Sequence, residues 1–469
     1  MQATKITPGK QAGTAVHWGA PALAMLMVLL APAAQAQHRH YNLPPEVPAA
    51  EQAELEQQRQ QLFLRIQASA DDTDANFAYA VLSTRLGDYE AAVATHERLL
   101  IQHPGSARIQ LELAALYFRL GAHAQAASLF EQVLARADTP PNVRLRVEGY
   151  LAAIAGQRRQ QGGFSGRLSL GLRGESNANA APDVGSIQLN GLEFELSPEA
   201  RAASDHSAQL GLQLRHRQPL AGSGHLLDIA FNAAGNQYRE LDRLDSQVAE
   251  LRIGPDLAIA PTRLRQGRWW TSAVVAQSWL DGRRYQRSQG LSTGLRWSVA
   301  RQSGLQLGMD WRDEHYTPPA DQASARGYSG QRRRGSVLFS QQASDNWQWL
   351  AGVSWEQRNA RNRWDSYQEP RLQLGLGHRH RALLGSGGQA WTSTLGMQQA
   401  WRRNDAPMPV MDRQQRQDGT EQLLQWATTV PLNPATELQL YAGWRRLQSN
   451  YDLRDYTNRY AGLTLACQF

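Results

Sequence analysis

The last eleven residues of the chain, Arg459 to Phe469, alternate strictly between apolar and more polar side chains. The apolar positions, every second residue, are Ala461, Leu463, Leu465, Cys467 and Phe469. A period of two places alternate residues on opposite faces of a β-strand. About ten residues of such alternation is the length of one tilted crossing of a bilayer by a barrel strand. The segment therefore predicts a membrane-spanning strand.

The two ends of the chain carry further signals. Phe469, which closes the alternating strand, resembles the C-terminal signal by which outer-membrane barrels are recognised, so we expect it to engage the barrel assembly machinery. Near the N-terminus, Lys5 and Lys10 precede an apolar run that ends in the A-x-A cleavage site Ala34-Gln35-Ala36. We predict a signal peptide over residues 1–36, a flexible lead-in over 37–50, and a location in the bacterial cell outer membrane.

Composition narrows the class of protein further. The chain of 469 residues is long enough for two or more domains. No apolar run reaches the ~18 residues of a transmembrane helix. The net charge is +7, but arginines are scattered and form no basic stripe, so we expect no nucleic-acid partner. Cys467 is the only cysteine, which excludes an intramolecular disulfide and a cysteine-based metal site.

Residues 51–160 have helical periodicity and contain a repeat. Leu86-Gly87 recurs as Leu120-Gly121, a shift of 34, and Ala80 and Ala92 recur as Ala114 and Ala126. A period of 34 with small residues where two helices cross is typical of tetratricopeptide (TPR) repeats. We predict an all-α, periplasmic TPR-like domain over 51–160. Its two repeats span 73–106 and 107–140, and helices at 51–68 and 142–158 cap the stack.

A TPR stack commonly binds peptide or protein on its concave face. The residues that we expect to contact a client there are Asp74, Phe77, Arg85, Arg108, Phe118 and Arg119. The alternative is that the stack only spaces the domains or docks on the barrel.

From residue 161 the period changes to two, and fifteen segments alternate like strands. Bacterial barrels of one chain have even strand numbers. Links at 300–303, 343–345 and 431–435 are short, whereas those at 315–331 and 401–419 are long. Short and long links alternate only if 174–205 is one outside loop, in which 186–196 is loop or a short inward hairpin. Residues 161–469 thus predict an antiparallel fourteen-stranded barrel with both ends in the periplasm. A soluble β-sandwich alternates too, but the signal peptide, Phe469 and the strand number favour the barrel.

Charged residues interrupt the polar face of several strands. Those that we expect in the lumen are Arg215, Arg296, Asp310, Arg312 and Arg445. They either shape a conduit or pair and hold the lumen closed. Glycines recur on the same face, which predicts space for bulky cargo or packing against a plug. The run Arg332-Arg333-Arg334 is typical of a solvated rim or of a contact with anionic lipid headgroups.

Catalytic and metal-binding motifs are absent from the sequence. It contains no nucleotide loop, zincin helix or nucleophile elbow. His315 with Asp313 and Glu314 is the best hydrolase constellation, but it is more typical of an ordinary polar loop. His38/His40 and His378/His380 each offer only two ligands. We therefore expect no enzyme activity, no cofactor and no metal site.

The combination of a TPR domain and a fourteen-stranded barrel resembles the surface lipoprotein assembly modulator (Slam) family, the translocators of type XI secretion. The resemblance extends from about residue 51 to Phe469. Its most specific element is the first loop, where Asn177, Asn179, Ala181 and Pro182 fit the family's D-N-x-N-x-A-P stretch and Glu175 is the only carboxylate.

The resemblance implies that the protein exports client proteins to the cell surface. These are surface lipoproteins or related secreted proteins that capture haem or metal, with the TPR domain engaging the client in the periplasm. The first loop is either structural or a contact with cargo. The alternative function is a porin-like or polysaccharide-export channel with a TPR recruitment domain.

Overall fold

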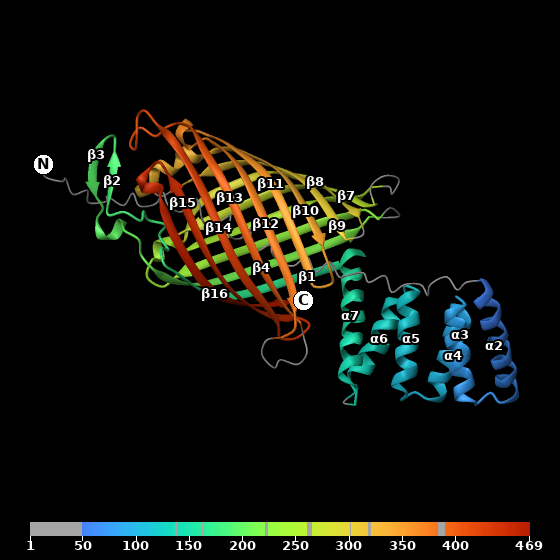
Figure 1. Cartoon of the computed structure of the whole chain (residues 1–469). Helices are drawn as coiled ribbons and strands as arrows, with labels where there is room; N and C mark the ends of the chain where they lie inside the picture. Colours follow the sequence, from blue (N-terminus) through green and yellow to red (C-terminus); the bar gives the residue numbers. More distant parts are fainter. Residues whose placement is uncertain are drawn as a thin grey trace. The chain divides into compact units, whose positions relative to one another are not determined.

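The computed structural model describes residues 49–136, 138–161, 163–220, 224–259, 265–300, 302–317, 320–382 and 390–469. The predicted signal peptide and nearly all of the predicted lead-in lie outside these residues. The chain divides between Gln160 and Gln161 into a helical unit and a unit of strands (Figure 1). None of the helices in the described ranges has the length and apolar character needed to cross a membrane.

The helical unit has the order that the repeat predicts. Its described helices are α2 (Ala49–Ala68), α3 (Thr73–Arg85), α4 (Tyr89–Gln102), α5 (Ala107–Arg119), α6 (His123–Leu134) and α7 (Pro141–Gln161). The two predicted repeats correspond to α3–α4 and α5–α6, and the predicted capping helices to α2 and α7. Asp72 and Asp88 cap α3 and α4 by accepting backbone N–H groups. Gly87 turns between α3 and α4 with φ +82°, a conformation that favours glycine.

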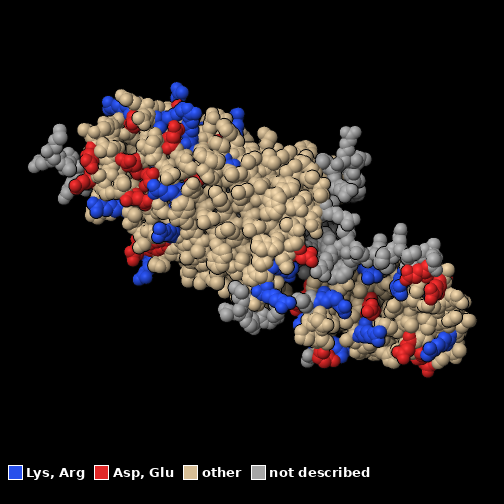
Figure 2. All heavy atoms as spheres, in the orientation of Figure 1, with Lys and Arg blue, Asp and Glu red and all other residues tan. Residues whose placement is uncertain are grey.

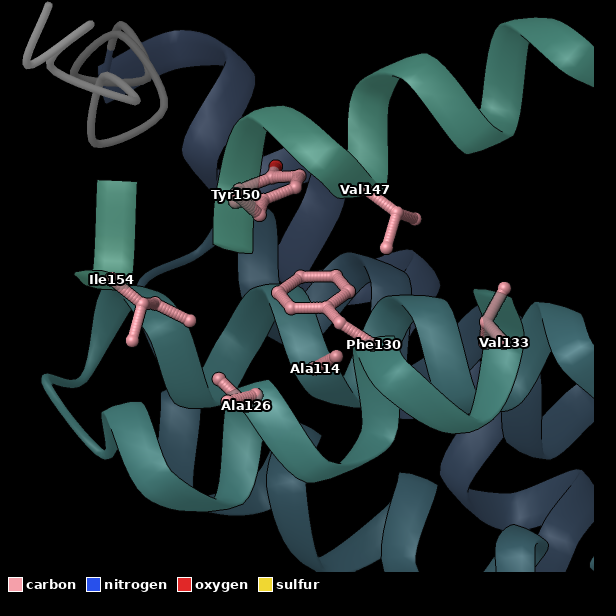
Figure 3. Close-up of a cluster of buried hydrophobic side chains, with 8 residues drawn as sticks. Ala114, Ala126, Phe130, Val133, Val147, Tyr150 and Ile154 are labelled. Atoms are coloured by element: carbon pink, nitrogen blue, oxygen red, sulfur yellow. The ribbon is translucent and has the colours of Figure 1, made fainter. Parts of the chain in front are cut away.

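Small residues allow the paired helices to pack closely. Ala80, Ala92, Ala114 and Ala126 are all fully buried. Figure 3 shows the core between α5, α6 and α7, in which Tyr150 of α7 lies against Phe130 of α6. The two rings stack with their centroids 4.7 Å apart. Helix α7 therefore covers the apolar face of the second repeat, as repeat stacks require.

The first repeat differs from the second at one core position. His96 stands where Phe130 stands one period later, and only 1% of its surface is exposed. Its Nδ1 atom has no hydrogen-bond partner within the described residues. Burial lowers the pKa of His96 from 6.5 to about 4, because the interior disfavours the charged imidazolium. The neutral ring packs 5.4 Å from the ring of Phe77.

This histidine predicts that the helical unit is acid-sensitive. Because the folded-state pKa lies below the unfolded value, the stabilisation is complete above pH 6.5 and is lost as the pH falls toward 4. The unit should lose about 2 kcal/mol between pH 8 and pH 5 through this group, and His96→Phe should abolish that part of the loss. Urea unfolding of residues 49–160, followed by circular dichroism at both pH values, checks this. An equal loss in the variant would contradict it.

The second unit is a closed antiparallel barrel of fourteen strands, as predicted. The strands are β1 (Gly163–Glu175), β4 (Asp205–Pro219), β5 (Leu226–Tyr238), β6 (Ser246–Ala258), β7 (Arg265–Leu280), β8 (Arg283–Ala300), β9 (Ser303–Tyr316), β10 (Gly330–Gln342), β11 (Trp347–Ala360), β12 (Tyr367–His380), β13 (Trp391–Pro407), β14 (Arg416–Pro431), β15 (Thr436–Ser449) and β16 (Tyr456–Gln468). Strand β16 pairs with β1, and reciprocal backbone bonds of 2.7 and 3.0 Å between Gly166 and Phe469 extend that pairing. The terminal aromatic residue thus takes part in closing the barrel.

The two ends of the barrel differ in their connections. At one end, here called the short-turn end, 343–346 and 432–435 join neighbouring strands, and β1 begins where β16 finishes. At the other, the long-loop end, the connections include 176–204, 317–329 and 408–415. One connection at the long-loop end is instead a tight turn, Asp281-Gly282, where both residues have positive φ and join β7 directly to β8.

Segment 186–196 forms a hairpin of β2 (Ser186–Leu189) and β3 (Leu192–Glu195). Figure 1 shows it beyond the strand ends at the long-loop end, so the inward placement considered from the sequence is wrong. The reason is its hydrogen bonding to neighbouring loops. The Asn190 amide donates to the carbonyls of Pro409 and Val410, and the backbone N–H of Gln188 donates to Asp452.

The barrel strands have one apolar face and one polar face. Every second residue points outward, and many of these side chains are solvent-exposed in the isolated chain, for example Leu170, Ile253, Leu291, Val353 and Met397. Cys467 also lies on this outward face and is exposed. Figure 2 shows that charged side chains gather toward the long-loop end and leave a largely uncharged surface along the middle of the barrel in this view. Such a band fits lipid. The residues at the alternate positions of each strand line the interior.

Candidate functional site

Inward-facing charged residues are concentrated in the half of the barrel next to the long loops. They form what we call the ion-pair belt: Glu250, Asp310, Arg312, Glu314, Arg332, Arg334, Glu356, Arg358, Glu369, Arg371, Arg402, Glu421 and Arg445. These residues come from β6 and from β9 to β15. Their side chains point inward because each lies at the parity opposite to the exposed apolar residues of its strand.

Glu356 of β11 is the most connected carboxylate of the belt. Arg334 donates to it through Nε at 2.8 Å, and Arg332 donates through Nη1 at 3.3 Å. The hydroxyl of Tyr367 donates to the other carboxylate oxygen at 2.7 Å. Two guanidinium groups and one phenol therefore depend on a single buried side chain.

Glu314 of β9 forms a second node. Arg332 donates to it through Nε at 2.7 Å, and Arg358 also pairs with it. The same Nη2 atom of Arg358 donates to the hydroxyl of Tyr316 at 2.7 Å. Because Arg332 contacts both Glu314 and Glu356, the two nodes are continuous across β9, β10 and β11.

The belt continues to both sides of these nodes. Glu369 pairs with Arg371 and accepts from Nε of Arg402 at 2.7 Å. The Arg402 guanidinium also lies 3.8 Å from the ring centre of Tyr367. On the other side, Nη1 of Arg312 donates to Glu250 at 2.8 Å. This last pair joins β9 to β6 and bypasses the two strands between them.

Burial separates the two halves of the interior. Glu369 is 1% exposed and Arg312 is 4% exposed, although both face the lumen. Large charged side chains reach such values only where the interior is filled. Toward the short-turn end the side chains of Arg215 and Arg296 are 41% and 37% exposed. Arginine side chains of the belt, such as Arg312 and Arg334, are thus more buried than those toward the short turns, although Asp256 between Arg268 and Arg296 is only 1% exposed.

The five predicted lumen residues all lie on the inward face. Asp310, Arg312 and Arg445 belong to the belt, and Nε of Arg445 donates to Glu421 at 2.7 Å. Nearer the short-turn end, Arg215 pairs with Asp228 and Arg296 pairs with Asp256. The sequence left two possibilities, a charged conduit or residues that pair with one another, and these five residues form ion pairs.

The inward glycines do not leave empty space. The ring of Tyr460 covers Gly443, that of Trp270 covers Gly294, and a Cβ atom at Gly462 would lie 2.5 Å from the hydroxyl of Tyr441. The lumen space predicted from these glycines is therefore occupied by neighbouring side chains, which are aromatic rings at these three positions and Ser169, Leu350 and Gln348 at Gly211, Gly375 and Gly377. Neighbouring large side chains commonly cover strand glycines in this way.

The strand face on which each residue lies changes two interpretations made from the sequence. Arg332 and Arg334 face inward and belong to the belt, so the two alternatives, a solvated rim or a contact with lipid headgroups, stay open only for Arg333, which faces outward and is exposed. His315 likewise faces outward from β9, whereas Glu314 faces inward. The candidate hydrolase residues are therefore split between the two faces of one strand.

The first-loop residues anchor the loop 176–204. The buried side chain of Asn177 donates to the carbonyls of Ala181 and Thr457 at 2.8 and 3.2 Å, and its Oδ1 accepts from the N–H of Ala181 at 3.0 Å. The Asn179 side chain donates to the carbonyl of Arg201 and accepts from the N–H of Ala203.

The other two first-loop residues have separate positions. Glu175 is the last residue of β1 and accepts from Asn458 at 2.6 Å, while Pro182 is buried. The sequence interpretation missed Asp205 at the far end of this loop, whose carboxylate accepts the N–H groups of Glu240 and Leu241. A turn-forming Asp before a strand is the signal that could have found it.

Asn177→Ala should loosen this loop. The change removes three side-chain hydrogen bonds and leaves buried backbone groups unsatisfied, which costs about 1–3 kcal/mol for each group. We expect trypsin to cut the folded barrel after the exposed Arg201 at least tenfold faster, with Asn433→Ala in a short turn as the control. Cleavage at the wild-type rate in both variants would contradict the anchoring role.

The six predicted client-binding residues do not all lie together. The Arg108 guanidinium of α5 lies 4.0 Å from the ring centre of Phe77 in α3, so these two share a surface. Phe118 instead packs edge to face on Tyr150 at 5.2 Å, within the α5–α7 core. Arg85 pairs with Glu51 of α2 at 2.9 Å. Asp74 and Arg119 are exposed. Client contact at these positions stays a prediction.

No cluster of three or more His, Cys, Asp or Glu side chains that could hold a metal occurs in the part of the chain that the structure describes. His378 stacks on Trp347 at 4.0 Å between ring centres, and Nε2 of His380 lies 2.9 Å from the hydroxyl of Ser393. His38 and His40 lie outside the described residues.

The closed barrel, with its apolar outward band and charged interior, defines an outer-membrane β-barrel protein that also carries a helical repeat unit. The model of the family "Surface lipoprotein assembly modifier" matches residues 165–469, and the chain belongs to this family. A tetratricopeptide-repeat model matches residues 83–146.

Comparisons with curated proteins found no match. Among solved structures, the outer-membrane channel DcaP of Acinetobacter baumannii is 9% identical with a TM-score of 0.38. The match covers 66% of this chain and 97% of the DcaP chain. A bacterial polysaccharide outer membrane secretin is 11% identical with a TM-score of 0.33, covering 64% and 98%. The toluene transporter TodX of P. putida is 9% identical with a TM-score of 0.35, covering 65% and 90%. At these scores the likenesses carry no argument about function.

Proposed function

We propose that the protein is a non-enzymatic translocator that carries surface lipoproteins, or related secreted proteins that capture haem or metal, across the outer membrane. The observation that carries the proposal is the ion-pair belt, whose arginine side chains are more buried than those toward the short turns. We place the short-turn end and the helical unit in the periplasm and the long loops outside. The family to which the chain belongs supports a lipoprotein client.

The belt suits a passage that is closed at rest. Its guanidinium and carboxylate groups satisfy one another, so the closed state leaves few charges unpaired in a region of low dielectric. A client must displace some of these pairs to pass, and polar groups of an unfolded chain offer replacement hydrogen bonds. We infer that the helical unit holds the client in the periplasm and that folding of the client outside draws it outward.

We propose two further partners. The barrel assembly machinery recognises the end of β16, where the exposed ring of Phe469 lies 6.3 Å from that of Phe164. Outer-membrane lipids cover the apolar outward band. Neither role involves nucleic acid or a cofactor.

Surface display of the client tests the proposal. The chain is co-expressed with the lipoprotein encoded beside it, and intact cells are treated with protease. We expect the client to be cut only when this chain is present, whereas an unrelated periplasmic lipoprotein stays protected. Display of the client without this chain would reject that client. If no neighbouring lipoprotein depends on the chain, the porin-like or polysaccharide-export channel becomes the better account.

A further inference from the structure

A row of polar side chains crosses the outward face of β10 to β13 near the long-loop end. Arg333 lies opposite Gln357, Gln357 opposite Gln368, and Gln368 opposite Arg403 in successive strand pairings. The row therefore spans three inter-strand steps, about 14 Å at the usual spacing of strands. An arginine stands at each end with two neutral amides between them.

An apolar row lies two residues further along each strand, toward the membrane band. Met309 of β9 and Trp355 of β11 flank Gly335 of β10 and are 69% and 50% exposed. A Cβ atom built at Gly335 would meet no atom within 4 Å. This outward glycine therefore leaves a slot between two large apolar side chains, directly beside Arg333 and unlike the covered glycines of the interior.

The arginines of the belt are neutralised by carboxylates, whereas the charge of the polar row is not neutralised in this way. The guanidinium of Arg333 donates to Gln331 at 3.2 Å and has no carboxylate partner within the described residues. The nearest acidic positions in the register are Asp313, opposite Gln331, and Asp418, opposite Arg403. Arginines at the edge of an apolar band suit phosphate oxygens, which they bind through paired N–H groups.

We propose that this surface binds a phosphorylated lipid of the leaflet next to the long loops. Arg333 and Arg403 take the phosphates of the headgroup, the two glutamines donate to its polar atoms, and one acyl chain fills the slot at Gly335. The inference uses the outer placement of the long-loop end from the proposed function, but it involves no client. The same strands carry Glu356, Glu369 and Arg402 inward, so a bound lipid also braces the wall behind the belt.

Native mass spectrometry of the full chain in detergent, titrated with bis-phosphorylated lipid A, tests the site. The double variant Arg333→Gln/Arg403→Gln should bind at least tenfold more weakly. Gly335→Leu should weaken binding severalfold with the arginines intact, because the leucine fills the slot, and the open space there means that it does not disturb the strand. Arg459→Gln is the matched control, since Arg459 is an exposed, outward arginine of β16 opposite Trp444.

Affinity within twofold of wild type in the control supports a defined site. An equal loss in Arg459→Gln would overturn the proposal, since binding would then follow overall charge. Unchanged affinity in the double variant, or equal binding of phosphatidylcholine, would also overturn it. Client display and lipid binding, both measured on the wild-type chain, separate the two proposals. Display without lipid binding defeats the lipid site alone, and lipid binding without display defeats the translocator alone.

Discussion

Glu356→Ala is expected to destabilise the barrel by about 3–5 kcal/mol, the usual cost of removing one partner from a buried ion pair. The change leaves Arg334 without the carboxylate that accepts its Nε at 2.8 Å, and it leaves the Tyr367 hydroxyl without its acceptor. Arg332 keeps Glu314, so the loss centres on the half-buried Arg334 and on the buried hydroxyl of Tyr367. Urea unfolding of the purified barrel in micelles, followed by tryptophan fluorescence, measures the difference.

The same variant should leak ions in planar bilayers, because the buried groups of the belt fill the interior there. Asp228→Ala is the matched control. It removes the partner of Arg215, whose side chain is 41% exposed and whose charge solvent screens, so its cost should stay below about 1 kcal/mol. Equal stability and equal conductance of the two variants would show that the belt neither holds the barrel together nor closes it.

Deleting residues 49–160 should abolish display of the client while leaving the barrel intact. The barrel closes through pairing of its own strands, so we expect it to fold without the helical unit. The client, by contrast, would lose the surface that we propose to hold it in the periplasm. Protease accessibility of the client on intact cells, with the chain quantified in the outer membrane, measures the effect.

Two controls accompany the deletion. The truncated barrel should retain the wild-type conductance and the heat-dependent gel mobility of a folded barrel. The variant Ile101→Ser, at a highly exposed position of α4, should display the client normally. If the truncated chain displays the client at the wild-type level, the helical unit plays no part in client handling.

The repeats and the strands could be predicted because both depend on local periodicity. The shift of 34 that relates Ala80 to Ala114 fixes where helices cross, and these alanines are fully buried. Strict alternation in segments such as 304–313 separates an outward from an inward face before any partner is known. The tight turn at Asp281-Gly282 also has a local signal, because an Asp-Gly pair between two alternating runs favours a two-residue hairpin.

The ion-pair belt could be predicted only in part. The alternation along β10 that places Leu338 inward also places Arg332 and Arg334 inward. The sequence alone could therefore have assigned these two arginines to the interior instead of the rim. Their partners could not be found this way. Glu356 lies 22 residues from Arg334 in the sequence and meets it only because the register of β10 and β11 brings Arg334 opposite Glu356. Strand register depends on turn geometry and on packing across the sheet, which local patterns do not contain.

The inward glycines show the same limit. A glycine on a strand leaves room for something, but the sequence does not say what fills it. The pairing of β15 with β16 brings Gly443 opposite Tyr460, whose ring then covers it. Outward Gly335 has Met309 and Trp355 as neighbours, and it stays open.

Site-specific cross-linking of the client tests the central claim, passage through the barrel interior, most directly. Ser336 and Val337 are consecutive residues of β10 that face inward and outward. A photoactivatable residue at each position, in cells that display the client, should give client adducts from position 336 and none from 337. Adducts from 337 alone, or from both positions equally, would contradict a route through the lumen.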